Sequence, residues 1–173
     1  MPTEPNELTV RRAREADLVA IAEIYNEGIR ARIATFETRE RAPGELRGWL
    51  ESPRHPLLVA ARSGEVLGWI AASSYRPRAC YAGVAEFSVY VAGRARGQGV
   101  GNALMPAFLA ACREAGLWKV LSRIFPENAA SLALCRRHGF REVGVYRRHA
   151  QLDGVWRDVV IVERLLYSEL HKD

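Results

Sequence analysis

The sequence predicts an α+β fold, in which helices flank a mixed sheet, and three observations support this prediction. Short apolar runs typical of strands alternate along the chain with longer segments whose apolar residues recur every three or four positions, as in amphipathic helices. A glycine-rich stretch connects one apolar run, 84–91, directly to a helical pattern that begins near Gly99. No repeat, linker or low-complexity tract divides the chain, so we expect one domain over 8–173.

The composition is that of a soluble globular protein. Hydrophobic residues make up 49% of the 173 residues and charged residues 26%, and no run of about 18 apolar residues that would span a membrane occurs. The 25 Lys and Arg residues against 20 Asp and Glu residues give a net charge of +5. These basic residues are scattered, without the aromatic and basic stripe of a nucleic-acid surface. We therefore expect neither a membrane nor a nucleic acid as a partner.

The cysteines and the N-terminus bear on the cellular compartment. Cys80, Cys112 and Cys135 are odd in number and widely spaced, which fits neither a disulfide framework nor a zinc-ligand pattern. We therefore expect no metal and a reducing, cytoplasmic compartment. Residues 1–7 are polar and acidic, unlike a signal peptide, and we expect them to form a disordered lead-in.

The first half of the chain predicts two helices and three strands. Residues 8–13 alternate as a short strand, and apolar residues from Leu18 to Ile29 recur at helical spacing behind two acidic residues that favour a helix N-terminus. Pro43 begins a second, shorter helix after a connection at 30–39. The next two expected strands, with a Ser-Gly hairpin turn between them, are 57–61 and 66–72.

The second half of the chain predicts two strand–helix units and a closing pair of strands. In each unit a glycine that follows the last apolar helical position marks the end of the helix. An Asp-Gly pair marks the turn between the closing strands. The expected elements are strands at 84–91 and 118–125, helices at 99–115 and 128–138, and strands at 140–146 and 155–165.

The stretch 97–101 carries three glycines and opens a helix. Such a loop points several backbone N–H groups at one spot, where the helix dipole adds about half a positive charge, so an anion such as a pyrophosphate is the expected ligand. Side chains at the glycines would block its approach, and Arg96 and Arg94 are suited to pair with phosphate. A dinucleotide fingerprint and a Walker loop are both excluded by the spacing. A plain glycine-rich turn is the alternative.

Two motifs resemble those of the GNAT acetyltransferase superfamily. Residues 96–101, Arg-Gly-Gln-Gly-Val-Gly, fit its Q/R-x-x-G-x-G/A signature, and residues 128–140 resemble its N-x-x-S/A-x-x-L-Y/H-x-x-x-G-F element. Three further segments, 35–38, 78–91 and 153–159, are similar to the phosphinothricin and methionine sulfoximine N-acetyltransferases. The resemblance implies a twisted, mostly antiparallel mixed sheet flanked by helices.

The resemblance further implies an acetyl-CoA-dependent N-acetyltransferase that acts on the amino group of a small amino acid or an analogue. The strand before the glycine loop would pair its backbone with the pantetheine arm, and the loop would bind the diphosphate. Asn128 either bonds to the same arm or caps the helix that it opens. The implied cofactor-binding residues are Val89, Tyr90, Val91, Arg96, Gly97, Gln98, Gly99, Val100, Gly101, Asn102, Asn128 and Ser131.

Glu86 is the expected general base, because an amine must lose a proton to attack a thioester. A solvated residue at a strand edge is the alternative. Cys135 stands where the superfamily often has tyrosine and the phosphinothricin group has histidine, so the resemblance implies an acid for the leaving thiolate. A small buried core residue is the equal alternative. His138 is a second candidate for the acid, and a residue on the outer face of the helix is the alternative.

The acceptor is expected to meet arginine and aromatic side chains. A guanidinium fork suits a carboxylate or phosphinate, although surface arginines in a solvated loop are the alternative. The candidate acceptor-binding residues are Phe36, Tyr75, Arg76, Arg78 and Tyr81. Tyr146, Trp156 and Asp158 are expected at the far rim of the site or at the contact of a homodimer, which the resemblance implies. A different amine (a polyamine, aminoglycoside or protein N-terminus) and a non-catalytic coenzyme A-binding module are the competing functions.

Overall fold

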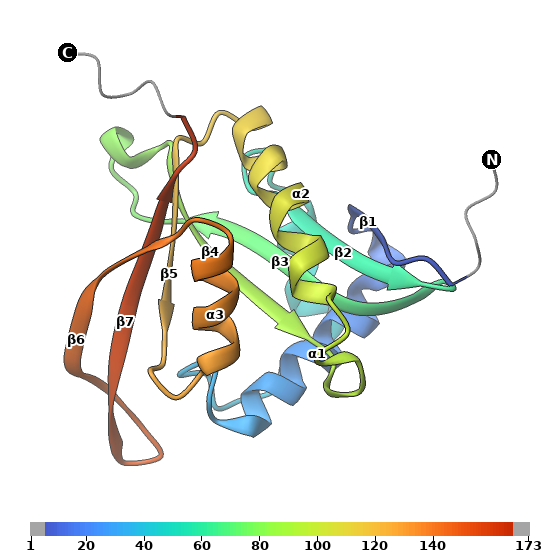
Figure 1. Ribbon diagram of the computed structural model, residues 1–173. Helices are drawn as coiled ribbons and strands as arrows, with labels where there is room; N and C mark the ends of the chain where they lie inside the picture. Colours follow the sequence, from blue (N-terminus) through green and yellow to red (C-terminus); the bar gives the residue numbers. More distant parts are fainter. Residues whose placement is uncertain (1–5, 168–173) are drawn as a thin grey trace.

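The computed structural model describes residues 6–167, which form a seven-stranded sheet flanked by helices (Figure 1). The strand order is β1-β2-β3-β4-β5-β7-β6, and β4 and β5 are the parallel pair in an otherwise antiparallel sheet. The predicted mixed, mostly antiparallel sheet is confirmed. The strands are β1 (Thr9–Arg12), β2 (Leu57–Arg62), β3 (Glu65–Ser74), β4 (Val84–Val91), β5 (Lys119–Ile124), β6 (Arg141–Leu152) and β7 (Val155–Leu165).

Three α-helices and four short 3-10 helices complete the described chain. The α-helices are α1 (Leu18–Ala31), α2 (Val100–Glu114) and α3 (Ala129–Arg137), and the 3-10 helices are η1 (Glu15–Asp17), η2 (Pro43–Leu50), η3 (Ala79–Tyr81) and η4 (Gly93–Ala95). No helix among residues 6–167 is long and apolar enough to cross a membrane. Of the predicted lead-in at 1–7, residues 1–5 lie outside the described residues.

Helix α1 covers one face of the sheet, and α2 and α3 cover the other (Figure 1). The indole Nε1 of Trp69 in β3 donates a hydrogen bond to the Ile21 carbonyl of α1, at 3.2 Å. The neighbouring Gly68 faces α2, where an added Cβ would lie 2.7 Å from Val100 Cγ1. Because successive strand residues point to opposite faces, these two contacts place α1 and α2 on opposite sides.

Aromatic side chains fill both layers of the core. On the α1 face, Trp69 stacks on Tyr90 with ring centroids 4.9 Å apart, and Tyr25 meets both rings edge-on. On the other face, Phe87 of β4 packs between Phe108 of α2 and Phe140 at the end of α3. Strand β4 therefore carries large side chains of both layers, and its position is fixed from both sides.

Strands β4 and β5 separate soon after they meet, as Figure 1 shows. Their parallel ladder joins only Val84–Glu86 to Lys119–Leu121, while β5 continues along its other edge in register with β7 up to Ile124. The C-terminal half of β4 keeps its pairing with β3 as far as Val91. Beyond Glu86, one edge of β4 therefore faces a gap in the sheet.

The predicted elements differ from the structure mainly at their ends. Helix α1 extends to Ala31, and the short helix after Pro43 is of the 3-10 type. The largest difference is β6, which runs to Leu152 where the sequence predicts a strand at 140–146. Register shifts against β7 between Tyr146 and Ala150 interrupt the alternation there, so the pattern hides the second half of the strand.

Candidate active site

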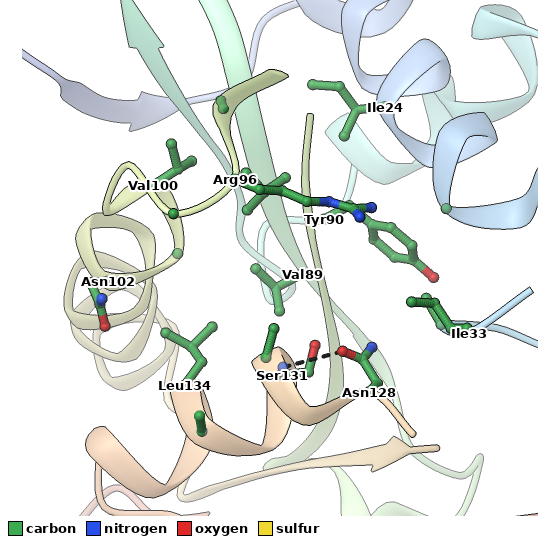
Figure 2. A pocket seen from close by; sticks show the side chains of 18 of the residues that line it. Ile24, Ile33, Val89, Tyr90, Arg96, Val100, Asn102, Asn128, Ser131 and Leu134 are labelled. Carbon is green, nitrogen blue, oxygen red and sulfur yellow. Dashed lines mark hydrogen bonds between the residues drawn. The ribbon is translucent and has the colours of Figure 1, made fainter. Parts of the chain in front are cut away.

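A cavity of about 470 Å³ lies between the C-terminal half of β4, the start of α2, α3 and the end of α1 (Figure 2). All the predicted cofactor-binding residues line it except Gln98. Residues far apart in the sequence therefore meet at one concave surface. The lining residues are Ile24, Gly28, Ala31, Ile33, Ala34, Val89, Tyr90, Val91, Ala95, Arg96, Gly97, Gly99, Val100, Gly101, Asn102, Asn128, Ala130, Ser131, Ala133, Leu134 and Arg137.

The glycine loop has a backbone that only glycine adopts without strain. Gly97 and Gly99 have φ values of +73° and +81°, and an added Cβ at either position would meet nothing within 4 Å. Glycine is therefore required at both positions for the left-handed conformation rather than for packing.

The start of α2 carries the properties of an anion site. Its N-cap is Gly99, whose carbonyl accepts the backbone N–H of Ala103 at 3.0 Å. The N–H groups of the first turn, residues 100–102, precede this intrahelical ladder, and these residues line the cavity. The helix dipole adds positive potential at the same point. The arrangement fits the diphosphate that the sequence predicts.

Gly101 has a different reason for being glycine. An added Cβ there would lie 3.1 Å from Leu134 Cδ2 of α3. A side chain at this position would be in tight contact with Leu134, which would have to shift by a few tenths of an ångström. The third glycine of the loop therefore allows the start of α2 to pack closely on α3.

The side chains of Arg96, Arg94 and Gln98 in the glycine loop have different surroundings. Figure 2 shows the Arg96 side chain extending across the cavity toward Tyr90. Arg94 instead forms an ion pair with Glu65 of β3 at 2.6 Å. The Gln98 amide donates to the Arg94 carbonyl at 2.9 Å and accepts from Arg62 at 3.0 Å. Of these three side chains, Arg96 is the one available to an anion in the cavity, and the other two hold the loop against the sheet.

The wall contributed by α1 escaped the sequence reasoning. Tyr90 lies against Gly28, where an added Cβ would come within 2.5 Å of its ring. Burial raises the pKa of Tyr90, so its hydroxyl is neutral at physiological pH. Gly28 lies in the last turn of α1, where a glycine usually signals the end of a helix, so the sequence gives no separate signal for this contact.

Asn128 caps α3, because its Oδ1 accepts the backbone N–H of Ser131 at 3.2 Å (Figure 2). Both residues also line the cavity. The capping alternative for Asn128 is therefore confirmed, and the geometry leaves its amide at the cavity wall, where the contact with the pantetheine arm stays a prediction.

A second, narrow recess of about 50 Å³ occupies the gap between β4 and β5. It shares Val89 and Tyr90 with the larger cavity, so the two adjoin. Ser122 donates from its hydroxyl to the Phe87 carbonyl at 2.9 Å across the gap. Cys135 of α3 contributes to the same recess, with 1% of its surface exposed. Burial raises the pKa of this thiol to about 12.

Glu86 lies where β4 and β5 part, as the last β4 residue of their ladder. Its Oε2 accepts a hydrogen bond from Nη2 of Arg123 in β5 at 2.6 Å. The Glu86 side chain is 22% exposed and that of Arg123 50% exposed. Residue 123 also contributes to the wall of the recess. No local sequence pattern points to Arg123, because the contact joins residues 37 positions apart.

The predicted acceptor residues fall into two separate places. Tyr75 and Tyr81 meet edge-on with ring centroids 5.4 Å apart, and the Arg76 guanidinium lies 5.1 Å from the Tyr75 centroid, all in the connection between β3 and β4. Arg78 is exposed in the same connection. Phe36 instead packs on Phe125 at 4.8 Å, beyond the end of β5. None of the five is among the residues that line the two cavities.

Two further sets of predicted residues have structural partners. His138 bonds through Nε2 to Oδ1 of Asn102 at 3.0 Å and so links α3 to α2. Burial, with help from nearby arginines, lowers the His138 pKa, which favours the neutral ring. Tyr146 and Trp156 are exposed on the β6–β7 hairpin, where Asp158 accepts the backbone N–H of Arg148 at 2.7 Å. Within residues 6–167, no cluster of three or more His, Cys, Asp or Glu side chains is arranged to hold a metal ion.

Comparison with known proteins agrees with this geometry. Residues 18–140 match the acetyltransferase (GNAT) family. A phosphinothricin N-acetyltransferase from Streptomyces coelicolor is 38% identical over 168 residues, which cover 92% of this chain and 97% of that one. An L-methionine sulfoximine/L-methionine sulfone acetyltransferase from Pseudomonas aeruginosa is 33% identical over 159 residues, covering 90% and 92%.

A solved structure extends the likeness to three dimensions. The phosphinothricin acetyltransferase from Sinorhizobium meliloti, in complex with acetyl-CoA, has a TM-score of 0.87 and 30% identity, over 96% of this chain and 92% of that one. Fold, cavity and motifs thus agree with the matched family, and this chain belongs to the GNAT acetyltransferase family and is an N-acetyltransferase.

Proposed function

We propose that this protein transfers an acetyl group from acetyl-CoA to the α-amino group of a small amino acid or amino-acid analogue, of the phosphinothricin or methionine sulfoximine type. The observation that carries the proposal is the continuity between the glycine-loop cavity and the recess lined by Phe87 and Arg123, which are the chain neighbour and the ion-pair partner of Glu86. The relatives named above act on such substrates. Acetyl-CoA supplies an acyl group activated as a thioester. The amine forms the amide bond as the C–S bond breaks, and coenzyme A leaves as the thiol.

The chain holds the donor through backbone and charge. The N–H groups of the first turn of α2 and the Arg96 guanidinium bind the diphosphate. The edge of β4 that faces the gap, at Val89–Val91, pairs with the amide groups of the pantetheine arm, as a neighbouring strand would. Asn128 bonds to the same arm from the opposite wall. The donor is thereby extended along β4 toward the recess.

Glu86 acts as the general base. Its carboxylate stands at the point where β4 and β5 part, next to the recess in which the reacting groups meet. It accepts the proton that the amine loses on attack. Positioning two substrates at this point supplies much of the rate, so a strong protein acid is not required. The raised pKa of Cys135 makes this thiol a poor proton donor, which favours its role as a packed residue beneath the recess.

A thiol-release assay tests the proposal. Acetyl-CoA is supplied with phosphinothricin, L-methionine sulfone, a polyamine, an aminoglycoside and a peptide with a free N-terminus. We expect turnover with the first two compounds, because the relatives named above act on substrates of this type. The polyamine and the aminoglycoside are polycations, which the exposed arginines in the β3–β4 connection repel. Turnover confined to the other amines would overturn the acceptor, and acetyl-CoA binding without turnover of any amine would favour the non-catalytic coenzyme A-binding module.

We also propose that residues 8–173 form one N-acetyltransferase domain, which acts in the cytoplasm as a homodimer. The dimer is supported by exposed apolar side chains on the β6–β7 hairpin at the edge of the sheet, since such a surface favours a partner. Light scattering measures the mass in solution, and a monomer at micromolar concentration would contradict the dimer. The exposed apolar side chains of the β6–β7 hairpin are Val143, Val145, Tyr146, Val155 and Trp156.

A further inference from the structure

The ion pair between Glu86 and Arg123 stands at the mouth of the gap in the sheet. The parallel register places Glu86 beside Leu121, and Arg123 lies two residues further along β5. Because residues two apart on a strand point to the same face, the two charged side chains lie on one face of the sheet and meet at 2.6 Å. Half of the Arg123 side chain is exposed. Both charges are therefore accessible to a small solute.

The chemistry of the pair matches the head group of an α-amino acid. Such an acceptor carries an ammonium and a carboxylate on one carbon, so its two charges are separated by about the length of an ion pair. Glu86 receives a hydrogen bond from one nitrogen of the guanidinium, and a guanidinium carries five N–H donors on three nitrogens. Once Glu86 is released, these donors are able to bind the carboxylate of an acceptor, which arginine holds in a forked geometry.

We infer that Arg123 binds the α-carboxylate of the acceptor and thereby determines specificity for amino acids, while Glu86 receives their α-ammonium. The inference rests on the proposed function, because it takes Glu86 as the base. When an amino acid binds, its ammonium replaces the guanidinium at Glu86 and its carboxylate replaces Glu86 at Arg123. Both protein charges stay paired through this exchange, which avoids the cost of leaving a half-buried charge alone.

An amine without a carboxylate meets the same pair at a disadvantage. Its ammonium has to compete with Arg123 for Glu86, and displacing the guanidinium leaves that cation without a new partner. The same residues that accept a zwitterion therefore discriminate against simple amines. Arg76, which the sequence reasoning selected for the carboxylate, instead lies over the Tyr75 ring.

The experiment compares L-methionine sulfone with its α-carboxamide, which keeps the amine and removes the negative charge. Steady-state kinetics are measured for the wild type, Arg123→Ala and Arg123→Lys, with Arg47→Ala as the matched control. Arg47 is an exposed arginine on η2 that, like Arg123, pairs with a glutamate, here Glu15, at 2.6 Å. Arg123→Ala is expected to lower kcat/KM for the sulfone by about 10- to 100-fold, mainly through KM, because a charge-assisted contact is lost.

The carboxamide distinguishes carboxylate binding from a structural role of Arg123, because a structural role would lower kcat/KM equally for the sulfone and the carboxamide. Its kcat/KM is expected to change far less in Arg123→Ala, and Arg123→Lys is expected to recover part of the sulfone activity. The KM for acetyl-CoA stays unchanged, and Arg47→Ala behaves as wild type. Equal losses on both compounds would show that Arg123 only positions Glu86, and no loss on either would exclude it from the site. Either result overturns the inference.

A binding measurement separates this inference from the proposed function. L-methionine sulfone is titrated calorimetrically into protein saturated with coenzyme A, so that no turnover is needed. Binding that is lost in Arg123→Ala supports the inference even if the wild type acetylates nothing, in which case the proposed function alone falls. A wild type that acetylates simple amines and fails to bind the sulfone overturns the inference and leaves the acetyltransferase activity standing.

Discussion

The donor side of the proposed site comes largely from one continuous stretch of chain, whereas the proposed acceptor side joins residues that are distant in the sequence. Residues 89–102 supply the β4 edge, the glycine loop and the first turn of α2. On the proposed acceptor side, Glu86 of β4 meets Arg123 of β5, which lies 37 positions further along the chain. A site built from backbone groups leaves a local sequence signature, while a site built from side chains leaves charges whose partners only the fold reveals.

The largest expected effect concerns the acceptor side. Glu86→Gln keeps the shape of the side chain and removes the carboxylate that we propose as the general base, so we expect kcat/KM to fall by about 10²- to 10⁴-fold, the usual contribution of general-base catalysis. The KM for acetyl-CoA should stay near its wild-type value. Glu142→Gln, which removes an exposed carboxylate paired with Arg136, serves as the control. Unchanged kcat/KM in Glu86→Gln would assign the base elsewhere.

The next effect concerns the donor side and has a matched control in the chain. Gly99 and Gly64 both have φ of +81° and no atom within 4 Å of an added Cβ. We expect Gly99→Ala and Gly64→Ala to lose similar stability, about 1 kcal/mol each from the left-handed backbone. Only Gly99→Ala should also raise the KM for acetyl-CoA. Equal KM values in the two variants would remove the loop from the cofactor site.

Substitutions of Arg96 and Arg94 test which arginine of the glycine loop contacts the phosphates of acetyl-CoA. Arg96→Ala should raise the KM for acetyl-CoA by about 10-fold at low ionic strength and by less at high salt, because the contact is electrostatic. Arg94→Ala should have a smaller effect, since this side chain pairs with Glu65. Kinetics at two salt concentrations measure both. A larger effect from Arg94 would reverse the assignment of the phosphate contact.

The smallest expected effect on activity is that of Cys135→Ala. This thiol has a pKa raised to about 12 by burial and stays protonated across pH 6–9; we therefore expect kcat to change by less than about threefold, since no proton transfer depends on it. Cys112, equally buried and with a pKa also raised to about 12, provides the control for lost packing. Selective loss of kcat in Cys135→Ala would restore the acid role.

The sequence identified the features that short-range physics determines. The glycine loop, its helix and the capping asparagine at 128 each follow from local rules, so they were predictable within a few residues. The roles of Gly28 and Arg123 were not predictable, because each depends on a residue that only the tertiary fold brings close: Tyr90 lies against Gly28, and Glu86 accepts a hydrogen bond from Arg123. The second half of β6 was hidden for a related reason, since register shifts against β7 break the alternation on which a strand prediction depends.

The early separation of β4 from β5 creates an edge inside a sheet rather than at its border. A border edge invites any unpaired chain to add a strand, and proteins have to guard against it. The interior edge of β4 lies between two walls, α1 and α3, and such an edge is suited to a slender, extended molecule with its own amide groups. The free backbone edge of β4 thus contributes to the selection of a ligand independently of the side chains around it.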